Sequence, residues 1–224
     1  MIDTSDAFAL SWSGGKDSAL ALRALQNKHG VEPRALITTV TSEYERVSMH
    51  GVRRALLERQ AERLALPLVE VTIPPKCVNA LYEERWLEAL TSADLEGVEE
   101  VAFGDLFLED VRRYRESLLA RARKCGVFPL WGIDTARLAR EFVAEGFRAL
   151  IACVDPKQLD GSFVGREYDA VLLDQLPAEV DPCGERGEFH TFVYAGPCFS
   201  EPIACRIGPV VERDGFVFCD IEEA

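Results

Sequence analysis

The sequence predicts an α/β fold, a doubly wound and mostly parallel five-stranded sheet with a small C-terminal α+β subdomain. Through the first 155 residues, short apolar runs alternate with helical patterns, as they do in βαβ units. Beyond residue 155, glycine and proline interrupt longer irregular stretches, and the end of the chain shows the pattern of antiparallel strands. We therefore expect two domains, which comprise residues 1–155 and 156–224.

The expected parallel strands are five short apolar runs, at residues 7–12, 34–40, 68–73, 98–103 and 149–154. Apolar residues between them, such as Leu138 and Phe142, recur at helical spacing, so each helix should present one stripe to the sheet. The last part of the chain predicts one short helix within residues 159–173. It also predicts a hairpin of strands 203–211 and 216–221 around an Asp214–Gly215 turn. The free edge of this hairpin makes a homodimer an expected assembly.

The composition indicates a soluble cytoplasmic protein with one substantial core and no membrane association. Hydrophobic residues make up 48% of the 224 residues, but no run reaches the roughly 18 apolar residues of a membrane span, and the N-terminus lacks a secretion signal. The net charge of −13 makes a nucleic-acid partner unexpected, and a cluster of Arg53, Arg54 and Arg59 is expected to be a solvated helix face. The seven cysteines are never spaced as CxxC, so neither a zinc ribbon nor a disulfide framework is expected.

The most informative segment is the loop SGGKDS at residues 13–18, between the first expected strand and an expected helix over residues 19–26. Gly14 and Gly15 permit positive φ angles, and the first helical turn directs its free amides and positive dipole end at an anion. Lys16 adds a positive charge, and Asp17 caps the helix or helps to hold Mg²⁺. The alternative is a capped Gly-Gly turn without a ligand. The position after the first strand favours a phosphate site made by Ser11, Ser13, Gly14, Gly15, Lys16, Asp17 and Ser18.

Further nucleotide contacts are expected where the other strands end. Ligands of open parallel sheets bind outside the carboxyl ends of the strands, so Thr38, Gly104 and Asp105 should border the same crevice as the loop. Gly104 would let a nucleotide approach the backbone. Asp105 would bind Mg²⁺ or a ribose hydroxyl, with a helix cap as the alternative. Trp131 is expected to serve in packing and not as an adenine platform.

The loop SGGKDS resembles the PP-loop of the N-type ATP pyrophosphatases, a group that includes GMP synthetase, NAD synthetase and several tRNA-modifying enzymes. The resemblance implies an adenine nucleotide alpha hydrolase-like, Rossmann-like fold, with residues 1–155 as the ATP-binding domain and residues 156–224 as the substrate-binding subdomain. It also implies that the loop holds the β- and γ-phosphates. ATP would then be cleaved between its α- and β-phosphates to give an adenylate and pyrophosphate.

Two C-terminal segments, LDGSFVGREYD at residues 159–169 and DPCGERGEFHTFV at residues 181–193, resemble signatures of the diphthine–ammonia ligase family of ATP-binding proteins. With the loop, the likeness runs from about residue 8 to about residue 203. It implies ATP-dependent adenylation of a carboxylate, which in that family is the carboxylate of diphthine on elongation factor 2, and displacement of AMP by ammonia. Residues 185–188 are ERGE where the family pattern has EGGE, and the loop at residues 42–51 looks like that of bacterial relatives. These two departures leave the identity of the carboxylate acceptor open.

Four polar residues of these segments are candidates for work on the substrate. Glu185 and Glu188 would orient ammonium or accept its proton, or they are exposed glutamates beside a strand. His190 would act as a base or bind the substrate, with a structural role as the alternative. Arg166 would pair with phosphate or a substrate carboxylate, or else with Asp169 or Glu167.

The favoured interpretation is an ATP-dependent amide ligase that uses ATP and Mg²⁺, a small-molecule or protein-borne carboxylate acceptor, and ammonia. Its catalytic candidates are Lys16, Asp17, Glu185 and Glu188, and its metal candidates are Asp17 and Asp105. One alternative is a tRNA-modifying PP-loop enzyme, which the acidic composition disfavours. Another is an ATP-binding sensor of the universal-stress type, which would not need the clustered polar residues after residue 155.

Overall fold

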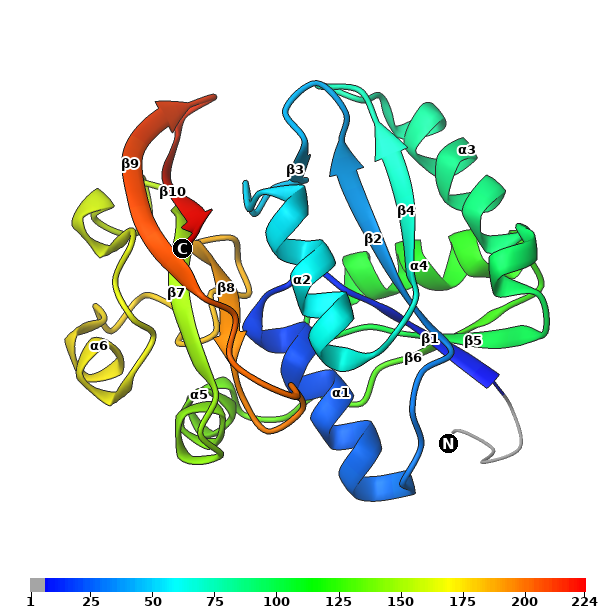
Figure 1. Ribbon diagram of the computed structural model, residues 1–224, viewed down its shortest axis with the longest axis horizontal. Coiled ribbons are helices and arrows are strands. Elements are labelled where there is room, and N and C mark those ends of the chain that lie inside the picture. Colours follow the sequence, from blue (N-terminus) through cyan, green and yellow to red (C-terminus); the bar gives the residue numbers. More distant parts are fainter. Residues whose placement is uncertain (1–6) are drawn as a thin grey trace.

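The computed structural model describes residues 7–224 and confirms the α/β class with a mostly parallel sheet (Figure 1). Five parallel strands lie in the order β4, β2, β1, β5, β6, and β3 pairs antiparallel with the end of β2. These strands are β1 (Ala7–Ser11), β2 (Ala35–Thr41), β3 (Arg46–Val47), β4 (Leu68–Ile73), β5 (Val98–Ala102) and β6 (Cys125–Val127). The first four expected strands therefore form where the apolar runs predict them.

Helices cover both faces of this sheet, as the doubly wound prediction requires. On one face lie α1 (Lys16–His29) and α2 (Arg54–Leu64), and on the other lie α3 (Asn79–Leu90), a short 3-10 turn (Ala93–Leu95) and α4 (Glu109–Arg121). Gly30 ends α1 in the left-handed conformation with φ 62°, which a glycine adopts without a steric penalty. Figure 1 shows α1 and α2 on the side of the sheet that faces the C-terminal part of the chain.

A second, antiparallel sheet is built from the C-terminal part, in the order β8, β7, β10, β9. Its strands are β7 (Arg148–Val154), β8 (Phe189–Ala195), β9 (Cys205–Arg213) and β10 (Phe216–Glu223), accompanied by α5 (Thr135–Ala144) and α6 (Ala170–Gln175). The hairpin forms as predicted, with positive φ at both Asp214 (51°) and Gly215 (85°), the combination of a type I′ turn. The helix expected within residues 159–173 is a 3-10 turn (Gly161–Phe163) followed by α6.

One expected strand belongs to a different sheet from the one predicted. The run at residues 149–154 forms β7, but it pairs antiparallel with β8 and β10 and not with the parallel sheet. The fifth parallel strand is β6, which is three residues long and contains Gly126, so it leaves almost no apolar pattern. Because β7 already belongs to the second sheet, we propose that the domain division lies before α5, ahead of the expected position at residue 155.

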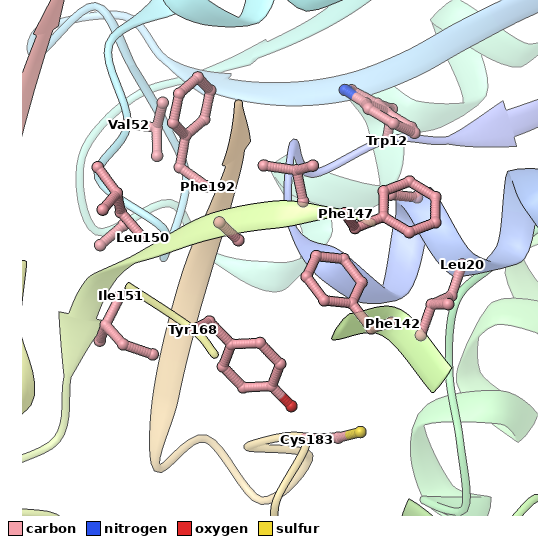
Figure 2. Packing of buried hydrophobic residues seen from close by; sticks show 14 of the residues in the cluster. Trp12, Leu20, Val52, Phe142, Phe147, Leu150, Ile151, Tyr168, Cys183 and Phe192 are labelled. Atoms are coloured by element: carbon pink, nitrogen blue, oxygen red, sulfur yellow. The ribbon is translucent and has the colours of Figure 1, made fainter. Parts of the chain in front are cut away.

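One continuous core joins the two parts of the chain. Figure 2 shows Trp12 and Leu20, from the first strand's end and α1, in the same cluster as Phe142, Phe147 and Phe192 of the C-terminal part. The rings of Phe142 and Phe147 stack with centroids 4.9 Å apart. Burial of large aromatic side chains dominates core energetics, so this shared cluster fixes the second sheet against α1.

Gln60 joins the two parts through hydrogen bonds inside this core. The side chain of Gln60 is fully buried on α2, and its Nε2 donates to the carbonyls of Gly14 (3.0 Å) and Val193 (2.6 Å). Its Oε1 accepts from Trp12 Nε1 at 2.8 Å, and the Val193 amide donates to the Gly14 carbonyl at 2.9 Å. One amide side chain therefore ties the glycine loop to both α2 and β8.

The arginine cluster is an ion-paired interface and not simply the expected solvated face. Arg53 contacts Asp220 of β10 through two hydrogen bonds of 2.9 and 2.7 Å, and Arg59 donates to Glu223 at 2.7 Å. Arg54 instead pairs with Glu70 of β4 at 2.8 Å. Hydrogen bonding from Arg53 lowers the pKa of Asp220, so this carboxylate is ionised at neutral pH. These pairs hold the C-terminal hairpin against the N-terminal part.

The outer edge of the second sheet is β9, on which Ile207, Val210 and Val211 are exposed. The homodimer expected from this edge stays a prediction. No helix within residues 7–224 is long and apolar enough to cross a membrane.

The bonds of Gln60 predict a stability effect. Gln60→Leu keeps the volume but removes the Gln60 bonds to the Val193 carbonyl and the Trp12 indole N–H, and it leaves the Gly14 carbonyl with the Val193 amide alone, which we expect to lower the free energy of unfolding by about 2–4 kcal/mol. Urea unfolding followed by circular dichroism measures it. The matched control is Gln26→Leu, because Gln26 bonds only the exposed Glu32, and we expect a change within about 0.5 kcal/mol. Equal effects of the two substitutions would contradict the role of Gln60.

Candidate active site

A cavity of about 250 Å³ opens at the carboxyl ends of β1 and β5. These neighbouring strands are the point at which the strand order reverses, where open α/β sheets bind their ligands. Four segments far apart in sequence line it. They are the end of β1 with the glycine loop, the loop that holds His50, the segment after β5 with α4, and the loop before β8 with the start of that strand. The lining residues used below are Ser11, Ser13, Lys16, Asp17, Ser18, His50, Gly104, Asp105, Arg115, Glu185, His190 and Thr191.

The two loop glycines are required by the space around them. Gly14 has φ +78°, and a Cβ on it would lie 2.7 Å from Gln60 Oε1. A Cβ on Gly15 would lie 3.0 Å from His50 Cε1 and 3.1 Å from the Thr191 carbonyl. A side chain at position 14 would be strained by the positive φ and would displace Gln60, whereas one at position 15 would press on His50 and the Thr191 carbonyl.

Lys16 is a buried cation at the floor of the cavity. Its side chain is 2% exposed, and its Nζ donates to both carboxylate oxygens of Asp17 (2.9 and 2.8 Å) and to the carbonyl of Cys183. Burial disfavours the ammonium, but the charge and hydrogen bonds of Asp17, together with the charges of Cys183 and Glu185, outweigh that effect and raise the pKa of Lys16. The Lys16 backbone amide donates to Thr191 Oγ1 at 3.0 Å. The lysine is therefore a fixed positive charge held by both parts of the chain.

The loop serines form a small hydrogen-bonded group at the same place. Ser13 Oγ and Ser18 Oγ are 2.9 Å apart, and Ser18 Oγ accepts from the Ser13 amide at 3.1 Å. Both serines line the cavity together with Ser11. Hydroxyls at the start of α1 are thus positioned next to Lys16, where they supply donors to an anion.

The segment after β5 borders the cavity through Gly104 and Asp105. A Cβ on Gly104 would lie 2.7 Å from the Asp17 carbonyl oxygen, so this glycine allows close packing against α1. Asp105 lines the cavity, but Arg115 pairs with it, with Nε 2.6 Å from Oδ2. The expected nucleotide and metal contacts of these residues stay predictions.

Thr38 does not line the cavity, although the strand-end argument placed it there. Its side chain is 2% exposed, and its hydroxyl has no hydrogen-bond partner among the described residues. Thr38 lies three residues before the end of β2, inside the sheet. The structure therefore does not bring Thr38 to the loop pocket.

The two glutamates after residue 180 have separate roles. Glu185 lines the cavity, and its Oε1 accepts from the amides of Leu106 (2.8 Å) and Phe107 (3.4 Å). Burial raises the pKa of Glu185 to about 7. A carboxyl group with such a pKa beside a fixed cation can exchange a proton at neutral pH, as a general acid or base does.

Glu188 is not part of the cavity wall. It is 1% exposed, and its two oxygens accept from the amides of Asp181 and Arg186, each at 2.9 Å. Its carboxylate therefore shapes the loop that presents Glu185. A direct catalytic role for Glu188 stays a prediction without geometric support.

Arg166 also lies away from the cavity. Its guanidinium stacks over the Phe163 ring at 4.7 Å and its Nη2 donates to Gln175 Oε1 at 2.5 Å. Neither of the ion pairs considered from the sequence forms, because Glu167 pairs with Arg148 at 2.8 Å and Asp169 caps α6. The geometry does not support the predicted contact of Arg166 with substrate.

His190 lines the cavity as part of a histidine pair. His190 and His50 stack with ring centroids 4.4 Å apart, and His50 Nδ1 is 3.3 Å from the Thr191 carbonyl. Burial lowers the pKa of His50 to about 4 and that of His190 well below its usual value. Both rings are therefore neutral at physiological pH and do not compete with Lys16 for an anion.

Sequence patterns did not indicate His50, Arg115 or Thr191. His50 lies in the loop at residues 42–51, which was singled out only for its likeness to relatives. Arg115 lies on α4, ten residues after Asp105, and Thr191 lies next to His190 on β8. Only the packing of the folded chain shows that both residues reach the cavity. Trp131 packs edge-on against Phe128 outside the cavity, with the two ring centroids 5.9 Å apart, and so serves in packing as expected.

Comparison with known proteins shows the family. A model of the diphthamide synthase N-terminal domain matches residues 7–127, which is more than half of the chain, and a model of the diphthamide synthase C-terminal domain matches residues 134–223. The chain belongs to the diphthamide synthase family. The two models meet between residues 127 and 134, between β6 and α5.

Curated relatives of this family carry one name. The chain is 27% identical to the diphthine–ammonia ligase of Homo sapiens and 25% identical to that of Rattus norvegicus, and each alignment covers 93% of this chain and 86% of the relative. It is 25% identical to the diphthine–ammonia ligase of Schizosaccharomyces pombe, over 92% of this chain but only 37% of that protein. The chain thus spans most of the mammalian relatives and little more than a third of the yeast one.

The Glu185 environment predicts a stability difference that depends on pH. Burial raises the pKa of Glu185 from 4.5 to about 7 in the folded state. The protonated carboxyl therefore contributes to the free energy of unfolding at low pH, and this contribution is lost as the pH rises from about 4.5 to about 7. Glu185→Gln keeps an acceptor oxygen without the charge. We expect this variant to gain stability relative to the wild type between about pH 5 and about pH 8, measured by urea unfolding. A difference that does not change with pH would show that the carboxyl group titrates normally.

Proposed function

We propose that this protein is an ATP-dependent ligase that adenylates a carboxylate and amidates it with ammonia. The observation that carries the proposal is one cavity in which a buried Lys16, in a PP-loop-like segment, faces Glu185, whose pKa is raised to about 7. Lys16 suits the binding of a phosphate chain, and Glu185 suits proton transfer. Membership of a family whose curated relatives are named diphthine–ammonia ligases supports the same reaction class.

The glycine loop would hold the β- and γ-phosphates of ATP. Lys16, Ser13 and Ser18 line one cavity at the start of α1, where the helix dipole also favours negative charge. A phosphate would replace Asp17 as a partner of Lys16. The buried position makes that charge worth more to a developing pyrophosphate than it would be in water.

The proposed reaction has two steps. A carboxylate oxygen of the acceptor attacks the α-phosphorus, and the bond from that phosphorus to the bridging oxygen of pyrophosphate breaks, which gives an acyl adenylate. The nitrogen of ammonia then attacks the acyl carbon, the carbon–oxygen bond to AMP breaks, and the nitrogen loses one proton. Glu185 is positioned in the cavity to take that proton, because a base with a pKa near 7 is half ionised at neutral pH.

Mg²⁺ is an expected companion of ATP, and the cavity offers it carboxylate donors. Asp17 and Asp105 both line the cavity with carboxylate oxygens, which Mg²⁺ prefers. Each carboxylate is already paired with a cation, Lys16 or Arg115, and no group of three or more metal-ligating side chains occurs in the described part of the chain. We propose that these two aspartates would hold a Mg²⁺ that arrives with ATP, where it would neutralise phosphate charge.

Separation of nucleotide products tests the proposal. With ATP, Mg²⁺, ammonium and cell extract as the source of acceptor, we expect AMP and pyrophosphate in the wild type and a loss of roughly 100-fold or more in Lys16→Ala. Glu188→Gln, which alters only the support of the loop, should keep more activity than Glu185→Gln. ADP as the product, or nucleotide binding without turnover, would contradict the ligase and favour an ATP-binding sensor. Dependence on tRNA in the extract would favour a tRNA-modifying enzyme.

The second step predicts a pH profile. As pH rises through about 7, Glu185 ionises and the wild-type rate should rise, because only the carboxylate can accept a proton. The rate of Glu185→Gln should be lower than that of the wild type and should not change with pH over the same range. Steady-state rates at saturating ammonia, corrected for the ammonia fraction at each pH, measure it. A rising limb that persists unchanged in Glu185→Gln would assign the proton to another group.

A further inference from the structure

The ring of His50 presents one free acceptor at the wall of the cavity. Its Nδ1 lies 3.3 Å from the Thr191 carbonyl oxygen, and because a carbonyl oxygen can only accept, Nδ1 carries the proton of this bond. Burial lowers the pKa of His50 to about 4, so the ring is neutral and Nε2 keeps its lone pair. This Nε2 has no hydrogen-bond partner among the described residues, yet it is not sealed in the interior. It is therefore accessible to a ligand in the cavity that His50 lines.

Contacts with two segments fix the orientation of this ring. His190 stacks on it, with the ring centroids 4.4 Å apart and the planes inclined by 29°. A Cβ on Gly15 would lie 3.0 Å from His50 Cε1, so the missing side chain at position 15 makes room for the ring. The His50 amide donates to the Ser48 carbonyl at 2.8 Å, within the turn that carries the ring. A ring held in this way loses little side-chain entropy when a ligand binds.

Glu185 supplies a second free acceptor to the same cavity. Its Oε1 accepts from two backbone amides, whereas its Oε2 has no hydrogen-bond partner among the described residues. The donors of the cavity are other groups, because the Lys16 ammonium and the hydroxyls of Ser13 and Ser18 suit phosphate oxygens. The space of about 250 Å³ is roughly eight times the volume of one water molecule, so a small molecule can lie between the two acceptors.

Only a reactant that has N–H or O–H groups can pair with these acceptors. Ionised phosphate and carboxylate groups carry no hydrogen, so neither the pyrophosphate part of ATP nor the carboxylate to be activated fits them. Ammonia fits, because it is small and has three N–H donors. Two hydrogen bonds to acceptors leave its lone pair free for attack on an electrophile.

We propose that His50 Nε2 and Glu185 Oε2 form the ammonia site, which makes His50 a catalytic residue of the second step. The inference rests on the proposed function. Ammonia donates one N–H to each acceptor, and its lone pair attacks the acyl carbon of the adenylate. The carbon–oxygen bond to AMP breaks and one proton passes from the nitrogen to Glu185. His50 keeps its hydrogen bond throughout and does not change its protonation state.

Two substitutions of His50 separate the roles of its ring nitrogens. In His50→Asn the amide nitrogen is as many bonds from Cβ as Nδ1 is, so the donor to Thr191 is kept and the acceptor is lost. In His50→Gln the longer side chain brings its amide oxygen to the position of Nε2, so the acceptor is kept. The matched control is Glu43→Gln, because Glu43 is an exposed residue of the same loop and does not line the cavity.

The test is the dependence of AMP formation on ammonium, with ATP, Mg²⁺ and cell extract freed of ammonium. We expect His50→Asn to raise the KM for ammonium by roughly tenfold, the factor that one hydrogen bond provides, and His50→Gln to stay within about threefold of the wild type. Exchange of labelled pyrophosphate into ATP without ammonium measures adenylation alone, and His50→Asn should keep most of it. Glu43→Gln should leave both quantities as in the wild type.

The outcomes separate this inference from the proposed function. An unchanged KM in His50→Asn, or equal increases in His50→Asn and His50→Gln, would overturn the ammonia site. Weaker binding of a non-hydrolysable α,β-methylene analogue of ATP to His50→Asn, measured by calorimetry, would also overturn it, because Nε2 would then accept from the nucleoside. Absence of pyrophosphate exchange in the wild type would instead sink the adenylation, and the ammonia site with it. Exchange that persists in His50→Asn beside a raised KM for ammonium sustains both.

Discussion

A charged lysine in the protein interior is the constraint on which the rest of the structure depends. An unpaired buried ammonium would cost several kcal/mol or lose its proton, so Lys16 can persist only with partners supplied on every side. Asp17 comes from its own helix, but the Cys183 carbonyl comes from the C-terminal part, as does the Thr191 hydroxyl that binds the Lys16 amide. The parallel sheet alone therefore does not complete the loop.

This dependence explains why the second sheet packs as closely as it does. Gln60 bonds the Gly14 and Val193 carbonyls together, and the shared aromatic core holds β8 against α1. Ion pairs from Arg53 and Arg46 to Asp220 then fix the hairpin against the N-terminal part. The groups around the loop are consequently preorganised before any ligand arrives, which is what electrostatic stabilisation of a transition state requires.

Neutral and ionisable groups are separated within the same cavity. The stacked pair of His50 and His190 stays uncharged, Lys16 stays charged, and Glu185 is close to its midpoint at neutral pH. The environment of each group sets this division, since all four border one space of about 250 Å³. A titrating carboxyl beside a fixed cation is a suitable arrangement for proton transfer during nitrogen attack.

The sequence predicted those features that local chemistry determines. The glycine loop, the first four strands and the Asp214–Gly215 turn each follow from residue types at fixed spacing, and all form as expected. The sheet that β7 joins could not be predicted, because a continuous apolar run is compatible with a strand of either sheet. The strand β6 is too short to show a recognisable apolar pattern.

Long-range packing determines the remaining site features. Glu185 and Glu188 look alike in sequence, yet Glu185 lines the cavity, whereas Glu188 accepts from two backbone amides of its own loop. Arg115 and His50 reach the site from a helix and a loop whose local patterns carry no sign of it. Arg166, prominent in a signature segment, stacks on Phe163 instead.

Binding of the pyrophosphate part of ATP by the Lys16 loop is the central proposal, and it can be measured without knowing the acceptor. Competition between inorganic pyrophosphate and a fluorescent ATP analogue, followed by displacement from the wild type and from Lys16→Ala, makes that measurement. We expect pyrophosphate to displace the analogue from the wild type and Lys16→Ala to lose affinity for both. Tight ATP binding that pyrophosphate does not disturb, or that survives unchanged in Lys16→Ala, would contradict it.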